Sequence, residues 1–122
     1  MAYEIEQPGA YWEVRLSGTI TLNDLLEAFT ALVARDPLKR LPDIWILPSE
    51  LDIPFVDYAS IVGAVAHAFQ GPPISRKSAV VAGDAFQRAR LELYRSEASA
   101  LPLDLRIFPT REAAVAWVNE AQ

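Results

Sequence analysis

The last third of the chain, from Lys77 to Val118, constrains the fold more than any other segment. It contains two short runs rich in apolar residues, 79–82 and 103–108, which stop at the chain breakers Gly83 and Pro109. A long amphipathic segment follows the first run, and a shorter one follows the second. Strand, helix, strand and helix in this order predict a βαβ unit with a final covering helix, and therefore an α/β fold.

The first third predicts a hairpin and a helix. The Pro8-Gly9 pair lies between the apolar segments 3–7 and 11–16, as in a β-hairpin turn. Leucine and phenylalanine then recur at helical spacing, so a helix should begin after Thr21 and end near Arg35. Asp24 stands three residues after Thr21, which suits an N-cap pair.

The middle of the chain predicts two buried strands, 44–47 and 78–82, because their apolar residues are continuous rather than alternating. Between them, a helix should run from Phe55 to Phe69 and end before the next prolines. The second strand should lead into a helix from Asp84 to about residue 100, with these residues facing inward: Phe86, Ala89, Leu93 and Tyr94. The final helix should be capped by Thr110.

The predicted element order is therefore β-β-α-β-α-β-α-β-α. A hairpin followed by alternating strands and helices predicts a small mixed β-sheet, antiparallel at the hairpin and parallel beyond it. The chain has 122 residues and shows no internal repeat or linker. We therefore expect residues 1–122 to form a single domain.

Composition excludes several classes of function. The residues are 52% hydrophobic and 22% charged, as in a globular protein, and the net charge of −5 argues against a nucleic-acid partner. The chain has no cysteine, which excludes disulfides and thiolate metal sites. The acidic start is unlike a signal peptide, and the uncharged stretch 61–69 is too short to span a bilayer. We therefore expect a cytoplasmic protein without a membrane span.

Two segments resemble a known family. Residues 77–83 read Lys-Ser-Ala-Val-Val-Ala-Gly, and residues 105–108 are followed by Glu-Ala-Ala-Val-Ala-Trp-Val at 112–118. Together with the element order, these segments resemble the STAS and SpoIIAA-like domains, the fold of bacterial anti-sigma-factor antagonists. The resemblance implies a small mixed sheet with helices packed on it, and a regulatory or binding role.

The phosphorylation motif of that family is altered here. In the phosphorylated antagonists, Asp-Ser-Ser-Gly opens the helix after the central strand, and its second serine accepts phosphate. Asp57 matches this motif, but Ala59 stands at the acceptor position and Ser60 stands where glycine would be. The resemblance thus implies the fold and not the switch, while phosphorylation of Ser60, displaced by one position, stays an alternative.

Catalysis by a Ser60–His67–Asp57 triad is a second alternative. His67 is the only histidine, and therefore the only side chain whose ordinary pKa lies near neutrality. On one helix, Ser60 and His67 would lie roughly 10 Å apart along the axis. A nucleophile and its base need about 3 Å. We therefore expect a protein that is not an enzyme, with a small hydrolase as the competing hypothesis.

The acidic residues of the 49–55 loop could attract a cation. Glu50, Asp52 and Asp57 follow a predicted parallel strand, where ligands often bind in α/β sheets. Their spacing matches no calcium loop, and Asp57 is well placed to cap a helix. The Gly83-Asp84 pair lacks a phosphate-loop pattern, so Asp84 is predicted to be an N-cap. We expect neither a metal nor a cofactor.

The helix 55–69 is poor in charge all round, and such a helix is usually covered by something. Its small residues would let another surface approach closely. This face and the preceding loop are therefore the predicted binding surface, and the partner could be a protein, a second copy of the chain or an apolar small ligand. The predicted binding residues are Ser49, Glu50, Asp52, Phe55, Asp57, Ser60, Gly63, Ala64 and His67.

Overall fold

A computed structural model describes residues 3–18, 20–36, 41–48, 77–97 and 104–120. The side chains of a few residues within these helices, Leu93 and Tyr94 among them, are outside the description. The strands are β1 (Tyr3–Glu6), β2 (Trp12–Leu16), β3 (Asp43–Ile46), β4 (Lys77–Val81) and β5 (Asp104–Phe108). The helices are α1 (Leu22–Arg35), α3 (Ala85–Glu97) and α4 (Arg111–Val118).

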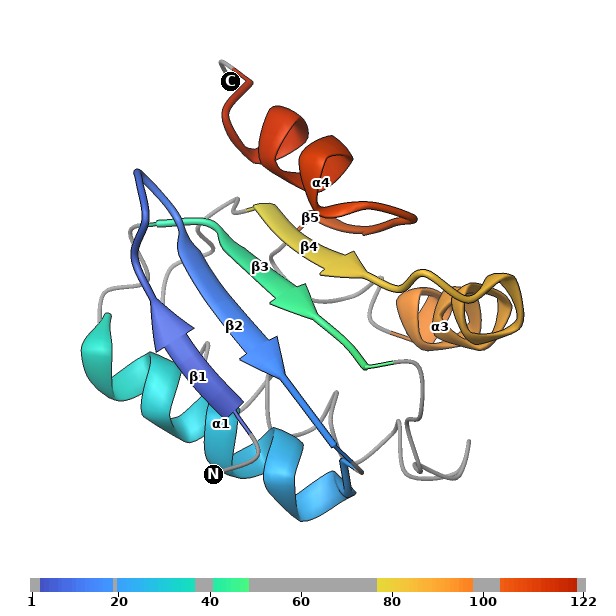
Figure 1. Ribbon diagram of the computed structural model, residues 1–122, viewed down its shortest axis with the longest axis horizontal. Coiled ribbons are helices and arrows are strands. Elements are labelled where there is room, and N and C mark those ends of the chain that lie inside the picture. Colours follow the sequence, from blue (N-terminus) through green and yellow to red (C-terminus); the bar gives the residue numbers. More distant parts are fainter. Residues whose placement is uncertain (1–2, 19, 37–40, 49–76, 98–103, 121–122) are drawn as a thin grey trace.

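The strands form one sheet in the order β1-β2-β3-β4-β5, so strands adjacent in sequence are also adjacent in space (Figure 1). β1 pairs with β2 in the antiparallel sense, with Ile5 opposite Val14. The pairs β2–β3, β3–β4 and β4–β5 are all parallel. The mixed sheet predicted from the hairpin and the alternating elements is therefore confirmed.

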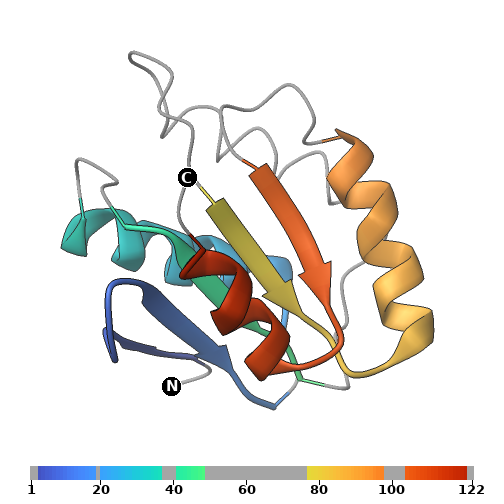
Figure 2. The same cartoon turned by 90° about the horizontal axis from the view of Figure 1, so that it is seen from above.

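The helices divide between the two faces of the sheet (Figure 2). α1 packs with Ala28 and Leu32 on Val14 and Leu16 of β2, and α3 packs with Leu91 on Val80 and Leu105 of the same face. α4 covers the opposite face, where its core residues meet those of β3 and β4: Ile44, Ala79, Val81, Ala114, Trp117 and Val118. Because successive strand residues point to opposite faces, Val80 and Val81 belong to different core clusters.

Local signals set most of the element ends. Thr21 Oγ1 accepts from the backbone N–H of Asp24 at 3.3 Å, and Asp24 Oδ2 accepts from the backbone N–H of Thr21 at 3.0 Å. This reciprocal pair is a capping box that satisfies backbone donors at the start of α1. Thr110 caps α4 by accepting from the backbone N–H of Ala113 at 3.3 Å. Both predicted caps are confirmed, as is the end of α1 at Arg35.

The prediction for the inward face of α3 was wrong at Phe86 and Ala89, while the side chains of Leu93 and Tyr94 lie outside the description. Phe86 is 72% exposed and Ala89 is also exposed, whereas Gln87 and Leu91 are buried. The helix is therefore rotated about its axis relative to the prediction. Phe86 and Ala89 are spaced as one face of a helix, but that face points away from the sheet.

Candidate binding surface

The carboxyl ends of the parallel strands β3, β4 and β5 lie together at one end of the sheet. Pairing continues just beyond the strands, since the backbone N–H of Leu47 donates to Val81 O at 3.0 Å and that of Ala82 donates to Phe108 O at 3.0 Å. Ligands and partners of open α/β sheets tend to bind beyond the carboxyl ends of the strands. A binding site is therefore expected near the residues that follow, Pro48 after β3 and Gly83 after β4.

The first turn of α3 is tied to the end of β4. Asp84 Oδ1 accepts from the backbone N–H of Phe86 at 2.9 Å, which confirms Asp84 as the N-cap. Arg88 Nη1 donates to Ala82 O at 2.9 Å and to Gly83 O at 3.0 Å. The Asp84 carboxylate occupies the place where a phosphate would bind a helix N-terminus, so this turn does not suit an anion.

Gln87 joins the same turn to the end of β3. Its side chain is 7% exposed, and Nε2 donates to Pro48 O at 3.2 Å. Its Oε1 is buried and has no hydrogen-bond partner among the described residues. Gln87 therefore joins the first turn of α3 to the end of β3 through one hydrogen bond in the described part of the chain.

Phe86 lies beside these anchored residues and points to solvent. Its neighbours Ala85 and Ala89 are exposed as well. Phe86 is the exposed large hydrophobic side chain among the described residues. It lies on a helix whose polar Gln87 is buried. The arrangement reverses the usual distribution of polar and apolar side chains on a surface helix.

A second polar cluster lies on the α4 face of β2. Glu13 is only 2% exposed and accepts from Arg15 Nη2 at 2.8 Å and from Arg111 Nε. Arg111 Nη2 also donates to the hydroxyl of Tyr11 at 3.3 Å. The hydrogen bond to Glu13 raises the pKa of Arg111 above its ordinary value. The pair between Arg111 and Glu13 joins α4 to β2, and the two arginines with one carboxylate leave a surplus of one positive charge.

A third cluster joins β3 to β4. Asp43 is buried, and its Oδ1 accepts from Ser78 Oγ at 2.5 Å and from Trp45 Nε1 at 3.1 Å. A serine beside a carboxylate resembles part of a nucleophilic site, but both residues are buried. The observed geometry stabilises a buried charge by hydrogen bonds.

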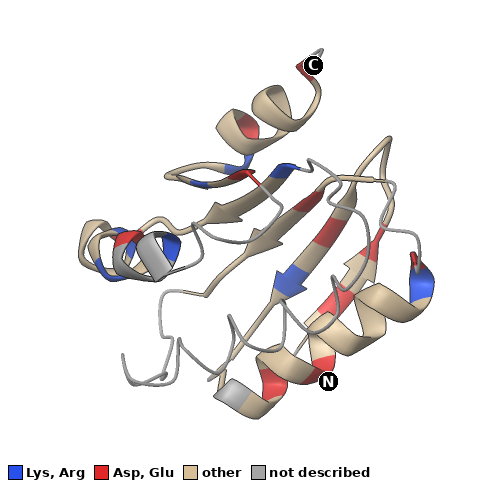
Figure 3. Ribbon diagram, turned by 180° about the vertical axis from the view of Figure 1, so that it is seen from behind, with Lys and Arg blue, Asp and Glu red and all other residues tan. Residues whose placement is uncertain are grey.

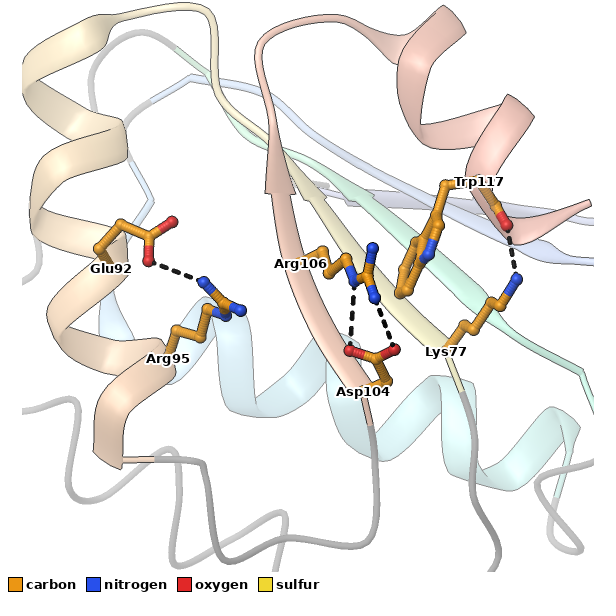
Figure 4. Close-up of polar contacts among 6 residues, drawn as sticks. All are labelled: Lys77, Glu92, Arg95, Asp104, Arg106 and Trp117. Atoms are coloured by element: carbon orange, nitrogen blue, oxygen red, sulfur yellow. Dashed lines mark hydrogen bonds and ion pairs between the residues drawn. The ribbon is translucent and has the colours of Figure 1, made fainter. Parts of the chain in front are cut away.

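Trp117 of α4 lies between two cations, Lys77 at the start of β4 and Arg106 in the middle of β5 (Figure 4). Lys77 Nζ is 5.2 Å from the ring centroid and Arg106 Cζ is 5.0 Å from it. Lys77 Nζ also donates to Trp117 O at 2.7 Å and to Glu120 O at 3.2 Å, while Arg106 pairs with Asp104. This cluster fixes the carboxyl end of α4.

The nine binding residues predicted from the sequence lie outside the described residues, and so does the predicted helix from Phe55 to Phe69. They are Ser49, Glu50, Asp52, Phe55, Asp57, Ser60, Gly63, Ala64 and His67, and their roles stay predictions. Across the ranges that the structure does describe, no three His, Asp or Glu residues are grouped so that they could hold a metal ion. None of the described helices is both long and apolar enough to cross a bilayer.

Comparison of the chain with protein-family models, with curated proteins and with solved structures finds no match. The surface around Phe86 and Gln87 was missed by the sequence reasoning, which placed Phe86 in the core. One signal could have revealed it: Gln87 and Leu91 are also one helical turn apart, so two inward faces were compatible with the spacing.

Proposed function

We propose that the protein is a non-enzymatic binding module of STAS-like fold, which recognises a protein partner beyond the carboxyl ends of β3 and β4. The observation that supports this proposal most directly is Phe86, which is 72% exposed in the first turn of α3. Aromatic side chains buried on association commonly contribute much of the affinity of an interface. Phe86, with an exposed alanine on either side, suits an anchor that a partner would cover.

The anchor is held in place before binding. Asp84 and Arg88 fix the first turn of α3 to the end of β4, and Gln87 fixes it to Pro48 at the end of β3. A pre-ordered anchor lowers the entropic cost of association, since fewer groups must be immobilised. The fixed position of Phe86 supports recognition by a rigid surface rather than catalysis.

The proposed surface is continuous in sequence with the one predicted from composition. Pro48, whose carbonyl oxygen binds Gln87, directly precedes the loop from Ser49 to Phe55. We include that loop and the charge-poor segment 55–69 in the proposed surface. The STAS-like assignment is supported by the N-terminal hairpin and the sequential strand order. Phosphorylation of Ser60 and hydrolysis by Ser60, His67 and Asp57 are the alternatives.

The proposal is tested by comparing Phe86→Ser with Glu92→Gln, a matched change at an exposed position of the same helix. Each protein is immobilised and exposed to an extract of the source cells, and its own native mass is measured by light scattering. We expect a protein, or a second copy, that the wild type and Glu92→Gln retain and that Phe86→Ser binds at least tenfold more weakly. Equal retention by all three proteins would overturn the proposal.

The same comparison separates binding from folding. Because Phe86 is mostly in solvent, Phe86→Ser should change the free energy of unfolding by no more than about 0.5 kcal/mol. A larger loss would mean that Phe86 belongs to the core in solution, which would also contradict the proposal. Urea denaturation of the two variants and the wild type gives this control.

A further inference from the structure

A second surface lies along β1, which is the edge strand of the sheet on the side opposite β5. β1 pairs with β2 on one side, and none of the described strands pairs with its other side. The Ile5 carbonyl oxygen accepts from Arg35 Nη1 at 3.4 Å, so it points away from β2. In an antiparallel pair the N–H and C=O of one residue point the same way, so the Ile5 amide also points to the open edge.

A groove runs beside this edge, between β1 and α1. It is largely open to solvent, has a volume of about 490 Å³, and is lined by Tyr3 of β1 and by one flank of α1: Asn23, Leu26, Glu27, Thr30, Ala31 and Ala34. From Asn23 to Ala34 the helix rises roughly 16 Å, at 1.5 Å per residue. An extended segment of about five residues has the same length, at 3.3 Å per residue. The groove and the free edge therefore match one added strand.

The surroundings of the edge are acidic. Glu4 and Glu6 are exposed on β1, and Asp24 and Glu27 belong to α1, while Arg35 lies at the end of that helix. Figure 3 shows these acidic segments along β1 and α1. A basic segment would be attracted to this edge by charge.

A second copy of β1 fits this edge poorly. If two β1 strands paired in the antiparallel sense about Ile5, Glu4 of each would lie opposite Glu6 of the other. Like charges in directly opposed positions destabilise strand pairing, and charged edge strands commonly prevent self-association. The charges of β1 therefore argue against self-pairing and for a partner of opposite charge.

We infer that the free edge of β1 and the groove along α1 accept an extended, basic segment of a partner protein as a sixth strand. Backbone hydrogen bonds to Tyr3 and Ile5 supply the pairing, with an amide of the segment replacing the exposed Arg35 Nη1 at the Ile5 carbonyl oxygen. Alternate apolar side chains of the segment fill the groove beside Leu26 and Ala31. This surface is distinct from that of Phe86, because β1 and β5 are the two opposite edges of the sheet and α3 packs at β5.

The inference is tested with a defined probe, the blocked hexapeptide (Lys-Val)₃, and with (Glu-Val)₃ as its charge-reversed counterpart. Each is titrated to about 5 mM into ¹⁵N-labelled full-length protein, which covers the range of weak strand addition. We expect (Lys-Val)₃ to shift the amide signals of β1 and α1 and to slow hydrogen exchange at Tyr3 and Ile5. (Glu-Val)₃ should bind at least tenfold more weakly.

Two variants locate the binding. Thr30→Arg places a long cationic side chain in the middle of the groove, and Ala116→Arg makes the same kind of change at an exposed position of α4. Arginine is a good helix former, so both proteins should fold. Thr30→Arg should weaken binding of (Lys-Val)₃ at least tenfold, and Ala116→Arg should leave it within about twofold of the wild type.

The inference would be overturned by no binding of (Lys-Val)₃, by equal binding of both peptides, by equal effects of the two variants, or by signal changes confined to α3. A concentration-dependent dimer that Thr30→Arg abolishes would replace the basic segment by a second copy, and would equally overturn it. None of these results depends on Phe86, so this inference and the proposed function can fail separately.

Discussion

At the scale of single residues, Glu13 shows why a charge can be tolerated inside this small fold. Its carboxylate is almost fully buried, but it accepts from Arg15 and Arg111, which reach it from β2 and from the first residue of α4. A buried charge is stable only when it is paired and hydrogen-bonded. Glu13 therefore contributes to the position of α4, together with the apolar contacts of that helix.

Glu13→Gln should lower the free energy of unfolding by about 1–3 kcal/mol, because a neutral amide removes the charged partner of both guanidinium groups and its NH2 group cannot accept a hydrogen bond. The matched control is Glu6→Gln, an exposed neighbour directly opposite Glu13 on β1. This change should cost no more than about 0.5 kcal/mol. Urea denaturation at pH 7 measures both, and equal effects would show that the Glu13 network does not stabilise the fold.

The raised pKa of Arg111 sets the pH dependence of this network. A group whose pKa is higher in the folded state stabilises that state fully below the unfolded pKa, which for arginine lies far above neutrality. The stabilisation is lost only as the pH rises through the folded value. The cost of Glu13→Gln should therefore be the same at pH 7 and at pH 9 in the same denaturation experiments.

At the scale of elements, α4 is defined at both ends by side chains. Thr110 caps its start, and Lys77 of β4 donates to two carbonyl oxygens at its end. Helix C-termini attract cations because their last carbonyl groups lack helical partners. The Thr110 cap could be predicted from the sequence, but the contribution of Lys77 could not, because it comes from a residue forty positions away.

Lys77→Met should keep most of the packing of the lysine side chain while removing its charge. We expect a loss of about 1–2 kcal/mol, from the helix-end contact and from the cation–π contact with Trp117 together. Arg95→Met on α3 is the control, since Arg95 forms an exposed pair with Glu92 and should contribute less than about 1 kcal/mol. Thermal and urea unfolding followed by tryptophan fluorescence would show whether the two variants differ.

The rotation of α3 marks the limit of prediction at this scale. Helical spacing made two faces compatible with burial, one with Phe86 and Ala89 and the other with Gln87 and Leu91. Hydrophobicity alone favoured the first. The hydrogen bond from Gln87 to Pro48, and the packing of Leu91 on Val80 and Leu105, favour the second. Both depend on residues far apart in sequence, so local periodicity could not choose between them.

At the scale of the whole molecule, the sequential strand order places β3 and β4 inside the sheet and β1 and β5 at its edges. Buried residues of the inner strands, Ile44 and Ala79 among them, have no exposed surface. Central strands usually open only with global unfolding, while edges open locally. The sheet should therefore be most stable in its middle.

Amide hydrogen exchange followed by NMR tests this order. Amides of β3 and β4 should exchange roughly two orders of magnitude more slowly than the outward-facing amides of Tyr3 and Ile5. Within β1, the amides of Glu4 and Glu6 should be protected, because those residues face β2. Uniform protection along β1 would contradict its place at the edge of the sheet.

Local sequence patterns predict the α/β class, the hairpin and the caps at Thr21, Asp84 and Thr110. They also predict the described strands and helices to within a residue or two, apart from the end of α3, which is expected near residue 100 and is described as far as Glu97. These features depend on periodicity, turn residues and capping groups that lie within a few positions of one another. Only the tertiary structure decided which side of α3 faces the sheet, how Glu13 pairs with Arg111 across 98 residues, and which strand edge stays open beside α1. The physical reason is that burial and pairing depend on neighbours in space, and local spacing carries no information about which distant residues those neighbours will be.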